Sequence, residues 1–185
     1  RIVLSWSLPA PIKVILFGLM PTGSINAGLL LVKELPLEIV GQISATDGCS
    51  DEERMDLVLA KRPELILLTG GTEGGADNVL RSSVDLVARS ISVLPQDLRP
   101  VVVFAGNSMV ADYVKTKLEP LTLIFTASNV QPRLSEVDIQ PAREFLSDVC
   151  NRMWVKRFIL QPGTRPLVLN QIRPSIRAIE DFLAI

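Results

Sequence analysis

The chain has 185 residues, of which 48% are hydrophobic and 21% are charged, so it is long and apolar enough to bury a sizeable core. Its formal net charge of −1 gives no attraction to nucleic acid or to an anionic membrane surface, so we expect neither as a partner. Histidine is absent, which excludes Ser-His-Asp and Cys-His catalysis and every metal site that contains histidine.

The two cysteines, Cys49 and Cys150, lie far apart in the chain and lack the spacing of a zinc site. We therefore expect no disulfide, no metal site and no cysteine nucleophile, as in a reducing cytoplasm. No apolar run is long enough to span a membrane, and the first apolar run is too short for a signal peptide. We expect a cytoplasmic protein and, because the chain begins at Arg1 without methionine, a fragment of a longer one.

Short apolar runs alternate with amphipathic segments along the chain. After a lead-in with a short strand at 2–6, the runs predict strands at 14–17, 38–43, 65–68, 101–104 and 121–125. The amphipathic segments predict helices at about 24–35, 50–62, 77–91 and 108–118, another from residue 141 and a last one at 174–183.

This alternation predicts a three-layer α/β/α fold with a mostly parallel five-stranded sheet, either Rossmann-like or flavodoxin-like. We expect the strand order 2-1-3-4-5, with 3-2-1-4-5 as the alternative. Residues 1–185 are predicted to form a single domain, with its core at about 12–157 and a C-terminal extension at 158–185.

Several predicted helices begin with residues that suit a helix N-terminus. Ser24 and Ser108 are predicted N-caps, since a serine hydroxyl accepts the backbone N–H groups that the first helical turn leaves free. Ser50 followed by Glu53 has the pattern of a capping box. Pro141 suits the first turn of the helix that it begins.

The most informative stretch follows the third predicted strand. The apolar run 65–68 reads as a strand buried on both faces, and four glycines follow it within six residues. A strand, a glycine turn and a helix leave backbone N–H groups at the carboxyl edge of a parallel sheet, which suits an anion. The alternative interpretation is a tight turn before a closely packed helix.

The exit of the first strand resembles a phosphate-binding loop but lacks one essential residue. Residues 18–24 read G-x-x-x-x-G-S, which is a Walker A loop without its lysine. Because that lysine neutralises the phosphate charge, we reject a P-loop NTPase.

Polar and small residues at four strand ends are predicted to meet at the carboxyl edge. Glu73, the acid of the glycine loop, could act as a base, bind a metal, accept a salt bridge from a partner or point into solvent. Asn107 and Asn129 could equally serve as turn residues, and Thr72 as a cap. No pair of acids, activated nucleophile or metal cluster can be assembled, so we predict no catalytic and no metal residues. The candidate ligand-binding residues are Ser24, Gly70, Gly71, Thr72, Glu73, Gly74, Gly75, Asn107 and Asn129.

Taken together, several of these stretches resemble the glutamate mutase accessory family called MutL, which is unrelated to the mismatch-repair protein of that name. The resemblance rests on residues 65–75 (LILLTGGTEGG), 100–107 (PVVVFAGN), 129–132 (NVQP) and 141–143 (PAR). It implies membership of the superfamily of actin, sugar kinases and heat-shock chaperone ATPases. It also implies a role as an accessory or reactivating protein for an adenosylcobalamin-dependent mutase.

The sequence departs from this family in two respects. The aspartate-glycine strands that bind phosphate in the superfamily are absent, so the chain resembles only a middle segment and no ATPase residue can be assigned. The loop has Glu73 where the resemblance leads us to expect aspartate.

We therefore predict a non-catalytic accessory domain that acts with a cobalamin-dependent mutase. This chain should need no cofactor, and the resemblance allows a nucleotide only in the full-length protein. The alternatives are a small nucleotide- or anion-binding module that uses the glycine loop, and a purely structural interaction domain.

Overall fold

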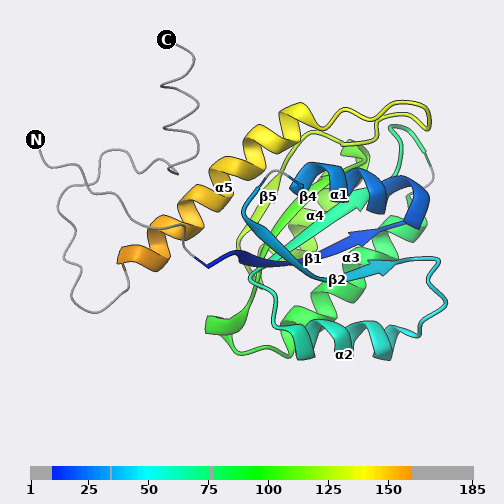
Figure 1. Cartoon of the computed structure of the whole chain (residues 1–185). Helices are drawn as coiled ribbons and strands as arrows, with labels where there is room; N and C mark the ends of the chain where they lie inside the picture. Colours follow the sequence, from blue (N-terminus) through cyan, green and yellow to red (C-terminus); the bar gives the residue numbers. More distant parts are fainter. Residues whose placement is uncertain (1–9, 34, 76, 160–185) are drawn as a thin grey trace, which may run out of the picture. The chain divides into compact units, whose positions relative to one another are not determined.

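A computed structural model describes residues 10–33, 35–75 and 77–159 of the chain (Figure 1). The predicted strand at 2–6, the predicted helix at 174–183 and residues 160–185 of the predicted extension lie outside the described residues.

Within the described residues, five parallel strands form one sheet in the order β2-β1-β3-β4-β5, which confirms the predicted fold class and strand order. The strands were predicted from apolar runs, and four of them extend slightly beyond those runs. The fifth was predicted to begin too early, because Leu121 and Thr122 both donate their backbone N–H to Leu118 and continue a turn. The strands are β1 Ile12–Gly18, β2 Leu37–Ser44, β3 Leu65–Gly70, β4 Val101–Gly106 and β5 Ile124–Thr126.

The helices lie in the connections between strands and after β5. The α-helices are α1 Asn26–Val32, α2 Asp51–Lys61, α3 Asn78–Ser92, α4 Ala111–Leu118 and α5 Gln140–Ile159. In the part of the chain that the structure describes, three short helical turns accompany them: η1 Pro21–Ile25, η2 Gln96–Leu98 and η3 Ser108–Val110.

Alternate strand residues face opposite sides of the sheet, and both sides are covered. Ile15, Ile66 and Phe104 belong to the core beneath α2, α3 and α4. On the other side, α1 packs closely enough that a Cβ on Gly28 would lie 3.8 Å from Leu16. Figure 1 shows α1 on one side of the sheet and α2 and α3 on the other. The predicted inward face of α3 is confirmed, because Leu80, Val84, Val87 and Ile91 are all fully buried.

The chain divides into two compact units, Pro11–Leu146 and a second unit made of Arg1–Ala10 with Ser147–Ile185. The whole sheet and the helices α1 to α4 belong to the first unit, and the boundary falls inside α5. The single domain with a core at about 12–157 stays a prediction.

Strand β2 lies at one edge of the sheet and contains an irregularity. Val14 of β1 pairs with Ile39, but the next residue, Ile15, pairs with Gly41. Val40 is therefore an extra residue on the edge strand, which is the pattern of a β-bulge.

The predicted helix starts have mixed outcomes. The capping box of α2 is confirmed: Ser50 Oγ accepts the N–H of Glu53 at 3.2 Å, and Glu53 accepts the N–H of Ser50 at 2.7 Å. The prediction for Ser108 was off by one residue, because the Asn107 side chain accepts the N–H of Met109 and caps η3. Pro141 lies in the first turn of α5, but the helix begins at Gln140, one residue earlier than predicted.

Candidate functional site

The glycine loop at the carboxyl end of β3 needs glycine for conformational reasons. Gly70, Gly71 and Gly74 have φ angles of 131°, 75° and 69°, a region that other residues rarely adopt. Gly70 and Gly71 are also packed against neighbours, since a Cβ would lie 2.8 Å from Leu19 Cγ and 3.0 Å from Asn107 Cβ respectively. At Gly74 a Cβ would meet nothing within 4 Å. Gly70 and Gly71 therefore allow the loop to pack closely against its neighbours, whereas the space around Gly74 is open.

Glu73 ties this loop to the loops that follow β4 and β5. Its carboxylate accepts the backbone N–H of Ser108 at 3.1 Å, the Ser108 hydroxyl, and the Asn129 side-chain amide at 2.7 Å. The same amide nitrogen of Asn129 donates to the carbonyl oxygen of Gly71 at 2.9 Å. The Glu73 carboxylate thus takes the N–H of Ser108 at the start of η3, and the Asn107 side chain takes that of Met109, so neither is left for an external anion.

These contacts change the acidity of Glu73. Partial burial acts to raise the pKa of its carboxyl, but the hydrogen bonds from Ser108 and Asn129 outweigh that effect, so the pKa lies below its usual value of 4.5. A lowered pKa means that the ionised carboxylate stabilises the folded loops above the unfolded pKa, and that this stabilisation is lost as the pH falls through the folded pKa.

We expect acidification from about pH 6 to about pH 3 to loosen the Glu73 tie, because the protonated carboxyl accepts these hydrogen bonds less well. The protection factor of the Ser108 amide against hydrogen exchange should fall over this range, even though the intrinsic exchange rate itself slows on acidification. A Glu73→Gln variant keeps the shape but cannot titrate, so its Ser108 protection should show no such pH step. An identical pH step in both proteins would mean that another group controls the loops.

Ser24 does not cap α1, so this prediction was wrong. The backbone makes a wide turn at η1, in which Ile25 N donates to Met20 O, and the Ser24 side chain folds back into that turn. Its hydroxyl accepts the N–H groups of Leu19 at 2.6 Å and Met20 at 3.2 Å, and the residue is buried. The serine hydroxyl therefore takes up the N–H groups of Leu19 and Met20 within the loop itself.

Because β1 and β3 are neighbours in the sheet, the loops that follow them lie side by side. A Cβ on Gly70 would lie 3.4 Å from Ser24 Cβ as well as against Leu19. Thr69 joins the same two segments from beneath, because its buried hydroxyl donates to the carbonyl oxygens of Phe17 and Ser24. Sequence reasoning missed Thr69, which reads as an ordinary strand residue.

Asn107 is fully buried beside Gly71, and only half of its amide is satisfied. Its Oδ1 accepts the N–H of Met109 at 3.1 Å, as expected for a turn residue. Its Nδ2 has no hydrogen-bond partner among the described residues. Buried donors are rarely left unpaired, so this nitrogen marks a place where an acceptor is missing.

The remaining candidates shape the loop. Gly75 donates its N–H to the carbonyl oxygen of Thr72 at 3.0 Å, which closes a turn. A Cβ on Gly75 would lie 2.6 Å from Thr72 Oγ1. The structure thus brings Glu73, Asn129, Asn107 and the glycines together, with Ser24 against Gly70; ligand binding by these residues stays a prediction.

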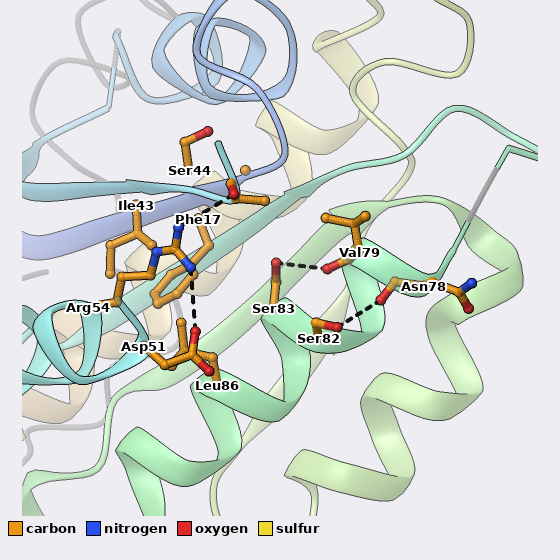
Figure 2. A pocket seen from close by; sticks show the side chains of 12 residues that line it. Phe17, Ile43, Ser44, Asp51, Arg54, Asn78, Val79, Ser82, Ser83 and Leu86 are labelled. Carbon is orange, nitrogen blue, oxygen red and sulfur yellow. Dashed lines mark hydrogen bonds and ion pairs between the residues drawn. The ribbon is translucent and has the colours of Figure 1, made fainter. Parts of the chain in front are cut away.

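A cavity of about 230 Å³ lies beyond the carboxyl ends of β1 and β2, between α2 and α3 (Figure 2). Arg54 supplies a cation that sequence reasoning missed, because the residue reads as part of a solvated helix face. Its guanidinium binds Asp47 at 2.7 Å and Asp51 at 3.4 Å, and Asp51 also binds Arg89 at 2.6 Å. The charge of Arg54 is therefore balanced by aspartates of the chain itself.

A second hollow, of about 370 Å³, lies beside the glycine loop. It is lined by Glu73, Pro132, Arg133 and Glu136. The last three residues belong to the polar link after β5, and none of them was predicted as a site residue. The backbone N–H of Glu73 donates to the carbonyl oxygen of Pro132 at 2.9 Å, so the link is attached directly to the glycine loop.

Three further predictions can be compared with the described residues. Cys49 and Cys150 are both free thiols, and burial raises the pKa of the Cys150 thiol to about 12. Among the described side chains, no group of three or more acids or cysteines is placed to hold a metal ion. The described helices include none with the length and apolar character needed to cross a membrane.

These features define an α/β domain with an all-parallel sheet and a glycine loop at its carboxyl edge. The family model described as MutL protein matches residues 2–170, and the chain therefore belongs to the MutL family. Protein MutL from Clostridium tetanomorphum is 30% identical over 87 residues, which cover 46% of this chain and 18% of that protein. The chain thus matches less than a fifth of that relative's length.

Among solved structures, the anti-anti-sigma factor PhyR from Bartonella quintana is similar with a TM-score of 0.46 and 17% identity. The similarity covers 81% of this chain and 52% of that chain.

Proposed function

We propose that this chain is a non-catalytic accessory domain of a MutL-type protein that acts with an adenosylcobalamin-dependent mutase of the glutamate mutase type, in the cytoplasm. Membership of the MutL family supports the accessory role. More specifically, the domain would bind the mutase and take part in its reactivation.

The observation that carries the proposal is the tie that Glu73 makes to Ser108 and Asn129. These hydrogen bonds fix the loops after β3, β4 and β5 relative to one another. The Ser24 hydroxyl fixes the loop after β1 in a similar way. Loops held in one arrangement lose little conformational entropy when a protein partner binds. Loops fixed in this way suit the recognition of a protein partner better than the binding of a small substrate around which the loops would have to close.

The unpaired Nδ2 of Asn107 favours the second candidate, a nucleotide- or anion-binding module. A phosphate or carboxylate oxygen that reached this buried nitrogen would supply the acceptor that it lacks. The position offers no lysine from the loop itself, so a triphosphate would be poorly neutralised there.

Two binding measurements on the 185-residue chain distinguish these candidates. We expect it to bind purified glutamate mutase in calorimetry and to hydrolyse no ATP, whereas phosphate, ATP and adenosylcobalamin should leave its melting temperature unchanged. A ligand that binds only the folded state at about a hundred times its Kd would add about 2.7 kcal/mol and be seen easily. A melting temperature that rises with phosphate or ATP, without mutase binding, would replace the accessory proposal by the second candidate.

A further inference from the structure

The link after β5 passes over the place where a sheet of this topology usually binds its ligands. In the order β2-β1-β3-β4-β5 the direction of strand addition reverses between β1 and β3, and α/β proteins bind ligands beside such a switch point, at the carboxyl edge. On the β1 side, the Gln131 side chain lies 3.3 Å from the position that a Cβ on Gly23 would take. On the β3 side, the carbonyl oxygen of Pro132 accepts the backbone N–H of Glu73 at 2.9 Å. Residues 131–138, which we call the strap, therefore reach across the switch point.

The strap is closed by hydrogen bonds of its own. The N–H of Asp138 donates to the carbonyl oxygen of Val130 at 3.0 Å, and the N–H of Glu136 donates to that of Arg133 at 3.1 Å. Arg133 and Glu136 also form an ion pair at 3.1 Å. In the described part of the chain, the one hydrogen bond between the strap and a different loop is the bond from the Glu73 N–H. The strap can therefore move as a unit once that bond breaks.

Little side-chain burial holds the strap in place. Residues 133–138 are all exposed, and the hollow of about 370 Å³ is lined by three strap residues together with Glu73. The residue before the strap is different, because Val130 is fully buried and donates its N–H to the carbonyl oxygen of Ala105 at 3.2 Å. Segments with few buried contacts open at a lower free-energy cost than the core does. We therefore expect opening to stop at Val130 and not to spread into the sheet.

Glu73 holds the strap and the neighbouring loops through different groups. Its backbone N–H binds the strap, whereas its carboxylate binds the N–H of Ser108 and the side chain of Asn129. Ser108 and Asn129 lie outside the strap, so the strap can lift while the carboxylate keeps the loops after β3, β4 and β5 together. Lifting frees the Glu73 N–H and uncovers the side of Gly23 that faces Gln131.

We propose that the strap is a lid over the switch point, closed in this structure and able to lift about its ends without unfolding of the domain. A molecule that uses the switch point would have to meet the open form, so the opening equilibrium would lower its apparent affinity. The inference goes beyond the accessory role and does not depend on it, because it concerns this chain alone.

Native-state hydrogen exchange tests the lid, because exchange of the Glu73 amide requires its bond to Pro132 to break. NMR follows the 185-residue chain at neutral pH, in urea concentrations below the unfolding transition. We expect the Glu73 amide to exchange through a small opening that urea does not change, with a protection factor at least about tenfold below that of the Ser108 amide. The Leu67 amide, in the buried strand β3, should exchange only through unfolding and therefore respond steeply to urea.

Two results of this measurement would overturn the inference. Protection of the Glu73 amide equal to or above that of the Ser108 amide would mean that the strap does not open before the loops. A Glu73 amide that follows the urea dependence of Leu67 would mean that the strap stays closed until the domain unfolds.

A matched pair of variants shows whether the contact across the switch point holds the lid closed. Gln131→Ala removes the side chain that lies against Gly23 and should speed exchange of the Glu73 amide about three- to tenfold, while Ser108 changes by less than about twofold. Gln140→Ala makes the same change in the first turn of α5, outside the strap, and should leave both amides within about twofold of the parent. An unchanged Glu73 rate in Gln131→Ala, or an equal increase in both variants, would refute the lid.

Discussion

Replacing Gly106 by alanine should lower the free energy of unfolding by about 3 kcal/mol, because the new methyl group has no space. Its Cβ would run into the carbonyl oxygen of Gly70 on the neighbouring strand and would lie 2.9 Å from the Phe104 ring. The carbonyl cannot move freely, since it accepts the N–H of Asn107 at 3.0 Å and Gly70 pairs with Gly106 in the sheet. The midpoint of urea unfolding measures the loss.

Gly28→Ala is the matched control for that change. Gly28 lies within α1, and a Cβ there would make ordinary contacts at 3.6 Å with Thr69. Alanine favours helix over glycine by up to about 1 kcal/mol, so this variant should be as stable as the parent or slightly more stable. A Gly106→Ala variant as stable as Gly28→Ala would show that β3 and β4 do not approach each other as described.

Replacing Gly71 by alanine should cost about 2–3 kcal/mol of stability, and the same change at Gly74 about 1 kcal/mol. Both residues have similar positive φ angles, 75° and 69°, so the backbone strain is nearly the same. A Cβ on Gly71 would also crowd Asn107 at 3.0 Å and Leu80 at 3.3 Å, whereas one on Gly74 would meet nothing within 4 Å. The difference between the two urea midpoints therefore isolates the packing role of Gly71.

The comparison has a clear failing outcome. If Gly74→Ala were as damaging as Gly71→Ala, the open half of the loop would have to contact other parts of the chain. If both changes were harmless, the positive φ angles of this loop would be wrong.

Much of the fold could be predicted because it depends on local patterns. The apolar run at 65–68 is fully buried in β3, and Leu80, Val84 and Val87 recur at helical spacing on the buried face of α3. The strand order followed because βαβ connections allow few arrangements. The convergence of Gly70, Glu73 and Asn129 at one edge followed from the parallel sheet alone.

The details of the site could not be predicted, because they depend on which partner each polar group finds across the fold. Ser24 has the sequence position of an N-cap, yet a wide turn directs its hydroxyl to the N–H groups of Leu19 and Met20. Glu73 and Ser108 are separated by 35 residues, and nothing in either segment indicates the other. The link that contains Pro132 has no periodicity, so its attachment to the glycine loop became visible only in the structure.

The extra residue in β2 affects how the sheet meets other molecules. An edge strand presents unpaired N–H and C=O groups, and a second chain with a regular strand could add itself there. Val40 interrupts the even spacing of these groups, and Glu38, two residues before it, adds an exposed charge. A regular strand added at this edge would lose its pairing at Val40, so the irregularity works against self-association through β2.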